Sequence, residues 1–198
     1  MDEQASAAPL RLGAVVLAGG TAVRMDGVDK ATLELGGVTL LERALAATTA
    51  AVDVVVVGTE VPTSRPVTWT REEPAGGGPA AGLLAGLDRF VRPPELVCAL
   101  AVDMPKVNAG TVARLTWATE ADPTADGAVL LDATGRRQTL AAVYRVESLA
   151  AARPGSREDE HGLPVRRLVA GLVLVDVPAV GDEALDIDSW ADLRDLGG

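Results

Sequence analysis

Two adjacent glycines and two cations stand close together near the start of the sequence. In the stretch VVLAGGTAVRMDGVDK, residues 15–30, an apolar run ends at Gly19 and Gly20, and Arg24 and Lys30 follow. Backbone without side chains lets N–H groups approach phosphate oxygens closely, and Arg and Lys can neutralise the phosphate charge. The stretch therefore predicts a site for nucleotide phosphates at the end of a strand, although a glycine pair by itself is compatible with a simple tight turn.

The spacing of the glycines excludes two common phosphate-binding motifs. The dinucleotide fingerprint G-x-G-x-x-G fails because Gly19 and Gly20 are adjacent and the next glycine is Gly27. The P-loop requires a glycine directly before its lysine, whereas Asp29 precedes Lys30. A different nucleotide-binding loop is therefore expected.

Lys30 is expected to lie at the surface. Its substitution would then weaken nucleotide binding and leave the melting temperature nearly unchanged.

A carboxylate follows a second apolar run. Asp103 comes directly after LVCALAV, residues 96–102, and Pro105 prevents the strand from continuing. Ligands of open α/β sheets bind at the carboxyl ends of the strands, so Asp103 is expected near the glycine pair. Mg²⁺ takes one or two carboxylates together with phosphate oxygens and water, which makes Asp103 a candidate metal ligand. The alternative is an Asp that only caps a turn.

Segments typical of strands and helices alternate along the chain, which predicts a three-layer α/β/α fold with a mostly parallel sheet. Residues 11–198 are expected to form a single domain, and residues 1–10 a disordered amino-terminal tail. The charged segment 153–162 is expected to be an exposed loop. The predicted strands are 12–18, 52–58, 66–70, 96–102, 126–132, 137–146 and 172–177, and the predicted helices are 39–50, 78–90, 108–120 (capped by Asn108), 163–172 and 189–196 (capped by Ser189).

Composition narrows the possible functions. The net charge of -10 over 198 residues argues against nucleic acid as a partner, because phosphate backbones are bound by basic surfaces. No apolar stretch is long enough for a membrane helix and the start does not resemble a signal peptide, so a cytoplasmic protein is expected. The single cysteine, Cys98, is expected to be buried, and the single histidine, His161, to lie at the surface.

The order of four motifs resembles the nucleotidyltransferase superfamily, and most closely the molybdenum cofactor guanylyltransferases. The motifs are LAGGTAVRM, the DK just beyond it, GGGPAAGLLAGL and VDMP, and the closing DIDSWADL is similar to the family's N-I-N-T-P-E-D-L. The resemblance extends from about Leu12 to that closing segment. It implies a single-domain Rossmann-like nucleotidyltransferase fold, Mg²⁺ as cofactor, and transfer of GMP from GTP to the terminal phosphate of molybdopterin with release of pyrophosphate.

The resemblance also implies roles for individual residues. Arg24 and Lys30 would neutralise the triphosphate, and Asp103 would bind Mg²⁺, so these three are the candidate catalytic residues. Asp188 would be a second metal ligand or merely a carboxylate beside a helix. The nucleotide would be bound by the backbone of Leu17, Ala18, Gly19 and Gly20, by Lys30 and Asp103, by Gly58 and Glu72 at the base and ribose, and by Gly78.

Departures from the family pattern leave the substrate open. Asp26 replaces a glycine, Glu72 replaces an aspartate, and DID replaces N-I-N. A cytidylyltransferase for the same cofactor and a guanylyltransferase for 2-phospholactate are alternatives within the same chemistry. A non-catalytic GTP-binding or cofactor-escort module is an alternative of another class. Transient contacts with molybdoenzymes or other cofactor-assembly proteins are also expected.

Overall fold

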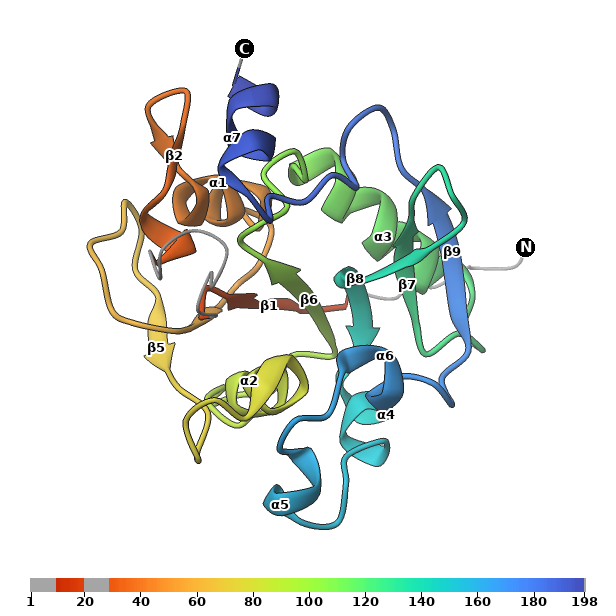
Figure 1. Cartoon of the computed structure of the whole chain (residues 1–198). Helices are drawn as coiled ribbons and strands as arrows, with labels where there is room; N and C mark the ends of the chain where they lie inside the picture. Colours follow the sequence, from red (N-terminus) through yellow and green to blue (C-terminus); the bar gives the residue numbers. More distant parts are fainter. Residues whose placement is uncertain (1–9, 20–28, 198) are drawn as a thin grey trace.

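The structure is a computed structural model that describes residues 10–19 and 29–197. It centres on a seven-stranded sheet in the order β5-β4-β1-β6-β8-β7-β9, with helices on both faces (Figure 1). A separate two-stranded hairpin joins β2 to β3. The main strands are β1 Leu12–Leu17, β4 Val54–Val57, β5 Thr68–Thr70, β6 Leu96–Ala101, β7 Gly127–Leu131, β8 Arg137–Arg145 and β9 Leu174–Pro178, and the hairpin strands are β2 Glu34–Leu35 and β3 Val38–Thr39.

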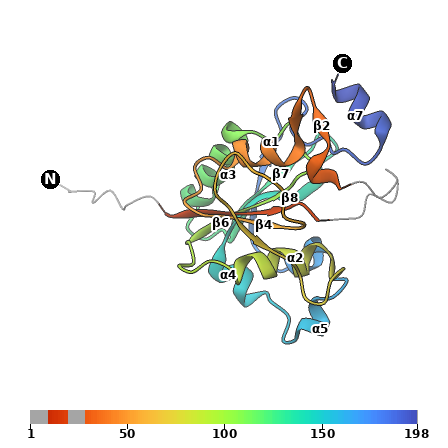
Figure 2. The same ribbon diagram turned by 90° about the vertical axis from the view of Figure 1, so that its left-hand side faces the viewer.

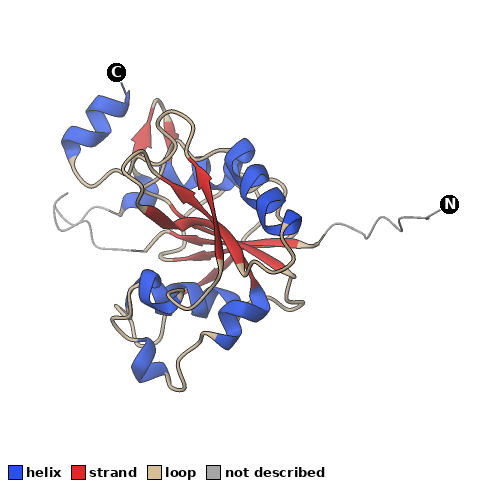
Figure 3. Cartoon of the chain, turned by 90° about the vertical axis from the view of Figure 1, so that its right-hand side faces the viewer, coloured by secondary structure: helices blue, strands red, loops and turns tan. Residues whose placement is uncertain are grey.

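The helices form two layers. Figure 2 shows α1 and α3 on one side of the sheet and α2, α4 and α5 on the other, and Figure 3 shows the sheet enclosed between them. The predicted three-layer α/β fold is therefore confirmed. The helices are the 3-10 helix η2 Lys30–Thr32, α1 Leu40–Ala47, α2 Gly78–Leu87, α3 Ala109–Ala121, α4 Val146–Ala151, α5 Arg157–Glu160, α6 Val165–Leu168 and α7 Trp190–Gly197.

Six of the seven strands of the main sheet point the same way. The pairs β1–β4, β1–β6, β4–β5 and β7–β9 are parallel, whereas β8 is antiparallel to both of its neighbours. The mostly parallel sheet was predicted, and β8 is its antiparallel strand. Because β1, β4, β5 and β6 are consecutive parallel neighbours, their carboxyl ends meet at one edge of the sheet.

The apolar runs of β1 and β6 are buried on both faces, as predicted for central strands of a parallel sheet. Successive side chains of a strand point to opposite faces, so β1 contributes to two cores. Ala14 and Val16 pack in the core below α1 and α3. Val15 and Leu17 pack in the core that α2 covers. Cys98 is buried in β6, as predicted.

Local capping signals in the sequence are confirmed. The Asn108 side chain accepts hydrogen bonds from Gly110 N and Thr111 N and so caps α3. Ser189 Oγ accepts one from Asp192 N at the start of α7. His161 is exposed. Within the described ranges, no helix is long and apolar enough to cross a membrane.

Two predictions about the last third of the chain were wrong. The helix expected over 163–172 is only α6, because Pro164 precedes it and Gly171 follows soon after. The segment 153–162 is not a simple exposed loop, since it includes α5 and its Glu160 is buried and bonded to Arg153. The hairpin β2–β3 and helix α4 were also not predicted.

Candidate functional site

The candidate site lies at the edge of the sheet where β1, β4 and β6 end. Asp103 follows β6 here, and the amide of Val102 donates to the carbonyl of Leu17 at 3.1 Å, so the exits of β1 and β6 stay side by side. The segment 186–188 reaches the same place from the far end of the chain. Ile187 N donates to the backbone carbonyl of Asp103 at 2.8 Å, and the Ile187 side chain is fully buried.

Lys30 connects these segments. It lies in η2, whose N-cap Asp29 accepts a hydrogen bond from Ala31 N. Its Nζ donates to Asp103 Oδ2 at 3.1 Å, to Asp188 Oδ1 at 3.1 Å and to the carbonyl of Ile187 at 2.7 Å. All three protons of the ammonium group therefore have an acceptor.

Burial of Lys30 corrects the expectation of a surface position. Its side chain is 14% exposed, compared with 28% for Asp103 and 57% for Asp188. Burial alone lowers the pKa of Lys30, but the charges and hydrogen bonds of Asp103 and Asp188 outweigh it and raise the pKa above 10.5. The lysine is therefore a fixed cation held between two carboxylates.

Two further carboxylates surround this group. Asp192 Oδ2 accepts hydrogen bonds from the Ser189 hydroxyl and from the amides of Asp188 and Ser189, which hold the pKa of Asp192 below its usual range. The pKa of Asp186 is raised by burial and then by the negative charges of Asp188 and Asp103. The described part of the site thus combines several carboxylates with the ammonium group of Lys30.

Asp103 and Asp188 are the described residues best placed to hold a cation. No group of three or more His, Cys, Asp or Glu side chains that could hold a metal ion occurs within residues 10–19 and 29–197. Two carboxylates that share one ammonium nevertheless suit Mg²⁺, which completes its shell with phosphate oxygens and water. This donor set could hold the metal only where a phosphate ligand supplies further oxygens.

The first glycine of the opening motif is held by β4. The amides of Ala18 and Gly19 both donate to the carbonyl of Val57 at 2.9 Å. These two N–H groups are thus used by the sheet, which narrows the expected amide contacts with phosphate to the backbone after Gly19. Gly20 and Arg24, together with Asp26, lie outside the described residues.

Gly58 has a structural reason to be glycine. A Cβ built at this position would lie 3.1 Å from Gly19 N and 3.2 Å from the carbonyl carbon of Ala18. The backbone after β4 therefore comes close to the backbone after β1, and a larger residue would push the two loops apart. Any contact of Gly58 with a nucleotide stays a prediction.

Glu72 and Gly78 flank the second glycine-rich segment. Glu72 Oε1 accepts a hydrogen bond from Gly76 N at 3.3 Å, so this side chain holds the loop that precedes α2. Gly78 has φ +87, which favours glycine, and begins α2. Gly162 N donates to the carbonyl of Gly77 at 2.8 Å, so the segment before α6 lies against this loop.

The structure thus brings Lys30, Asp103 and Asp188 into direct contact, and Gly58 against Ala18 and Gly19. Sequence reasoning missed the carbonyl of Ile187 as a ligand of Lys30, and it missed Asp192. The pattern S-x-x-D over 189–192 was a sequence signal for Asp192, because it is typical of a capping box.

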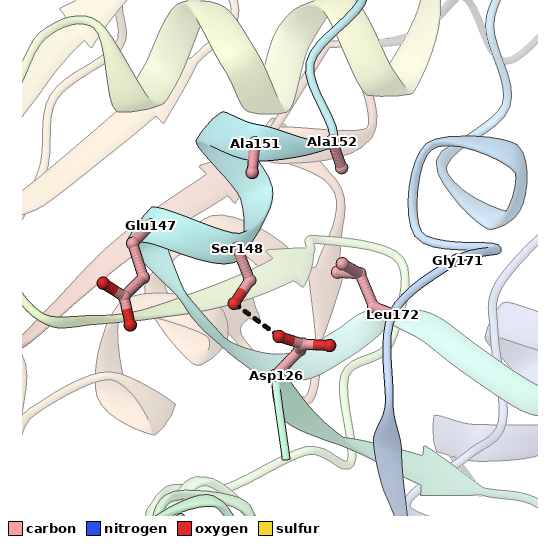
Figure 4. Close-up of a pocket in the computed structure, with 7 residues that line it drawn as sticks. All are labelled: Asp126, Glu147, Ser148, Ala151, Ala152, Gly171 and Leu172. Atoms are coloured by element: carbon pink, nitrogen blue, oxygen red, sulfur yellow. Dashed lines mark hydrogen bonds between the residues drawn. The ribbon is translucent and has the colours of Figure 1, made fainter. Parts of the chain in front are cut away.

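A hollow of about 540 Å³ lies at the opposite edge of the sheet, near the start of β7 (Figure 4). Asp126 accepts hydrogen bonds here from Ser148 Oγ and Val173 N, both at 2.7 Å. The two carboxylates that line the hollow, Asp126 and Glu147, would repel a triphosphate. None of the predicted site residues that the structure describes lines it. Its lining residues are Asp126, Glu147, Ser148, Ala151, Ala152, Gly171 and Leu172.

Comparison with known sequences identifies relatives over most of the chain. Residues 14–184 match the MobA-like NTP transferase domain. A phosphoenolpyruvate guanylyltransferase of Streptomyces scabiei is 37% identical over 129 residues, covering 62% of this chain and 55% of that protein. A molybdenum cofactor guanylyltransferase of Burkholderia lata is 37% identical over 126 residues, covering 59% and 60%. The matches thus span less than two thirds of these relatives.

Solved structures share the fold. Molybdopterin-guanine dinucleotide biosynthesis protein A of Archaeoglobus fulgidus superimposes with a TM-score of 0.69 at 21% identity, covering 93% of this chain and 96% of that one. The 2-C-methyl-D-erythritol 4-phosphate cytidylyltransferase of Thermus thermophilus gives 0.66 at 21% identity, covering 95% and 98%. At these identities the likeness concerns the fold alone.

Proposed function

This chain belongs to the MobA-like NTP transferase family, and we propose that it is a nucleotidyltransferase that transfers GMP from GTP to the terminal phosphate of molybdopterin. The products are molybdopterin guanine dinucleotide and pyrophosphate. Guanine is favoured because the two relatives at 37% identity are both guanylyltransferases by name.

The observation that carries the proposal is the contact of Lys30 with Asp103, at 3.1 Å, beside the end of β1. A cation and a carboxylate at the carboxyl edge of a parallel sheet are what a nucleoside triphosphate with a divalent metal requires. Lys30 would bind phosphate oxygens, together with Arg24. Asp103 and Asp188 would hold Mg²⁺, which when bound neutralises charge on the phosphates.

The reaction needs little covalent help from the protein. An oxygen of the acceptor phosphate forms a bond to the α-phosphorus of GTP, and the bond from that phosphorus to the bridging oxygen breaks. Pyrophosphate leaves with the bonding electrons. The attacking phosphate is already an anion, so no general base is required, and positioning and charge stabilisation dominate.

The other nucleotide contacts are part of the same proposal. Gly20 would bind the phosphates through its amide, beside Gly19, whose own amide donates to Val57. Glu72 and Gly58 would line the base and ribose, and the backbone of the second glycine-rich loop would approach the nucleotide at Gly78. The Glu72 side chain would have to bind the nucleotide while it also accepts from Gly76 N. A carboxylate has enough lone pairs for both.

A second candidate acceptor is phosphoenolpyruvate. It is supported by the Streptomyces relative, which is 37% identical over 129 residues. Phosphoenolpyruvate and 2-phospholactate also present a phosphate monoester, so the same residues would act in the same way. Cytidylyl transfer is supported by a shared fold alone, as with the Thermus enzyme.

The test is pyrophosphate release by the full chain with Mg²⁺. Each of GTP and CTP is combined with molybdopterin, phosphoenolpyruvate or 2-phospholactate, and the product is identified by mass spectrometry. We expect release with GTP and molybdopterin, and its loss in Asp103→Asn. Pyrophosphate release only with phosphoenolpyruvate or 2-phospholactate would mean that this compound, and not molybdopterin, is the acceptor. GTP binding without turnover on any acceptor would favour the non-catalytic module.

A further inference from the structure

A buried carboxylate outside the candidate site anchors the segment that carries Asp188. Glu183 is 6% exposed. Its Oε1 accepts from Thr111 Oγ1 at 2.6 Å and from Arg114 Nη1 at 3.2 Å, and its Oε2 accepts from Arg114 Nη2 at 2.6 Å and from Val180 N at 2.8 Å. Four donors, two of them on one guanidinium, hold this carboxylate in one orientation.

The donors come from two places. Thr111 and Arg114 lie on α3, whose buried side chains pack on the sheet. Val180 belongs to the connection between β9 and α7, as does Glu183 itself. The carboxylate therefore fastens this connection to α3. Burial raises the pKa of Glu183, but the bonds from Arg114 and Thr111 outweigh it and keep the pKa below its usual value.

The fastened segment leads directly to the ligands of Lys30. Four residues beyond Glu183, Ile187 pairs with the backbone of Asp103 and its carbonyl accepts from Lys30 Nζ. Four residues span at most about 14 Å when extended. The segment is thus fixed at Glu183 and at Ile187, with little chain between the two points to absorb a shift.

We propose that Glu183 is a positioning residue, whose bonds to Thr111 and Arg114 hold the segment 184–188 so that Ile187 and Asp188 bind Lys30. The importance of this for transfer rests on the proposed function, in which Lys30 binds the triphosphate. The expected effect on the contacts of Lys30 does not rest on the proposed function, because it concerns the protein without substrate.

A matched pair of variants separates positioning from general stability. Glu183→Gln keeps the shape and removes the charge that holds Arg114. Asp126→Asn makes the same kind of change at the opposite edge of the sheet, where the partly buried Asp126 accepts two hydrogen bonds rather than four. Both variants lose a structured carboxylate, but only Glu183 is connected to the ligands of Lys30.

The first measurement uses the two lysines of the chain, Lys30 and Lys106. The full chain without nucleotide is labelled with trace acetic anhydride, and mass spectrometry gives the reactivity of each lysine relative to the unfolded protein. In Glu183→Gln we expect the ratio of Lys30 to Lys106 labelling to rise roughly two- to tenfold, which corresponds to the net contribution of about one hydrogen bond. In Asp126→Asn we expect no change in the ratio.

The second measurement is transfer kinetics, where Glu183→Gln is expected to raise KM for GTP more than Asp126→Asn does. Labelling requires no substrate, so absence of turnover in the wild type would refute the proposed function and leave the labelling result to decide the role of Glu183. An unchanged ratio in folded Glu183→Gln, or a parallel rise at both lysines, would overturn the proposal. If Glu183→Gln does not fold, Arg114→Lys, which keeps the charge but loses the bidentate pair, takes its place. If neither folds, Glu183 is structural and the proposal is wrong.

Discussion

Replacement of Lys30 by methionine tests whether the three bonds of its ammonium group hold the site together. The methionine keeps an unbranched apolar side chain in the 14%-exposed position but leaves Asp103, Asp188 and the carbonyl of Ile187 without their common donor. Hydrogen bonds to charged groups contribute about 1.5–3 kcal/mol each to the free energy of unfolding. Ion pairs with exposed partners contribute about 0–1 kcal/mol.

The bond to Asp188 belongs to the weaker class, since that carboxylate is 57% exposed. Loss of the bonds to Asp103 and to the carbonyl of Ile187 is partly offset, because the variant no longer has to desolvate an ammonium group. We expect Lys30→Met to lower the free energy of unfolding by about 1–3 kcal/mol. For a domain of this size the corresponding fall in Tm is roughly 2–12 °C.

The dependence on pH gives a second readout. The folded state raises the pKa of Lys30 above 10.5, so its stabilisation is complete below the unfolded pKa and is lost as pH rises through the folded pKa. The difference in stability between wild type and Lys30→Met is therefore constant on the alkaline side of neutrality and decreases only above pH 10.5.

Urea denaturation and thermal unfolding of the full chain measure both effects, and Lys106→Met is the control. Lys106 Nζ donates to the carbonyl of Leu196 at 3.3 Å, a single bond outside the candidate site. A Tm for Lys30→Met that equals that of Lys106→Met would refute the reasoning, because the bonds to Asp103 and Ile187 would then contribute nothing.

Three further predictions follow from burial and contact. Asp103→Asn is expected to abolish transfer in a pyrophosphate assay, since an amide is a poor ligand for Mg²⁺, and turnover near the wild-type rate would exclude Asp103 as the metal ligand. Gly86→Ala is expected to cost about 1–3 kcal/mol in urea denaturation, because its Cβ would lie 2.5 Å from Val15 Cγ1, whereas Gly155→Ala, which has open space, is expected to be neutral. Burial raises the pKa of the Cys98 thiol to about 12, so a thiol reagent is expected to react only after unfolding, and rapid reaction of the native protein would contradict the buried position.

Local features of the sequence were sufficient for most of the fold. The apolar runs of β1 and β6 predicted strands buried on both faces, because such continuous runs are typical of parallel sheets covered by helices. Asn108 predicted the start of α3, because helix capping depends on residues within one turn. The position of Asp103 at the end of a strand was also readable, since an apolar run that stops at Asp and Pro defines its own end.

The tertiary structure decided which distant groups meet. Lys30 is 73 residues from Asp103 and 158 from Asp188, and no local pattern relates their positions. The order of the strands brings the exits of β1 and β6 together, and the connection after β9 returns over them through Ile187. The sequence alone predicted a lysine that binds phosphate, whereas the folded chain makes it a partly buried cation already bound to two carboxylates. Backbone hydrogen bonds and long-range burial, which are formed only in the folded chain, account for that difference.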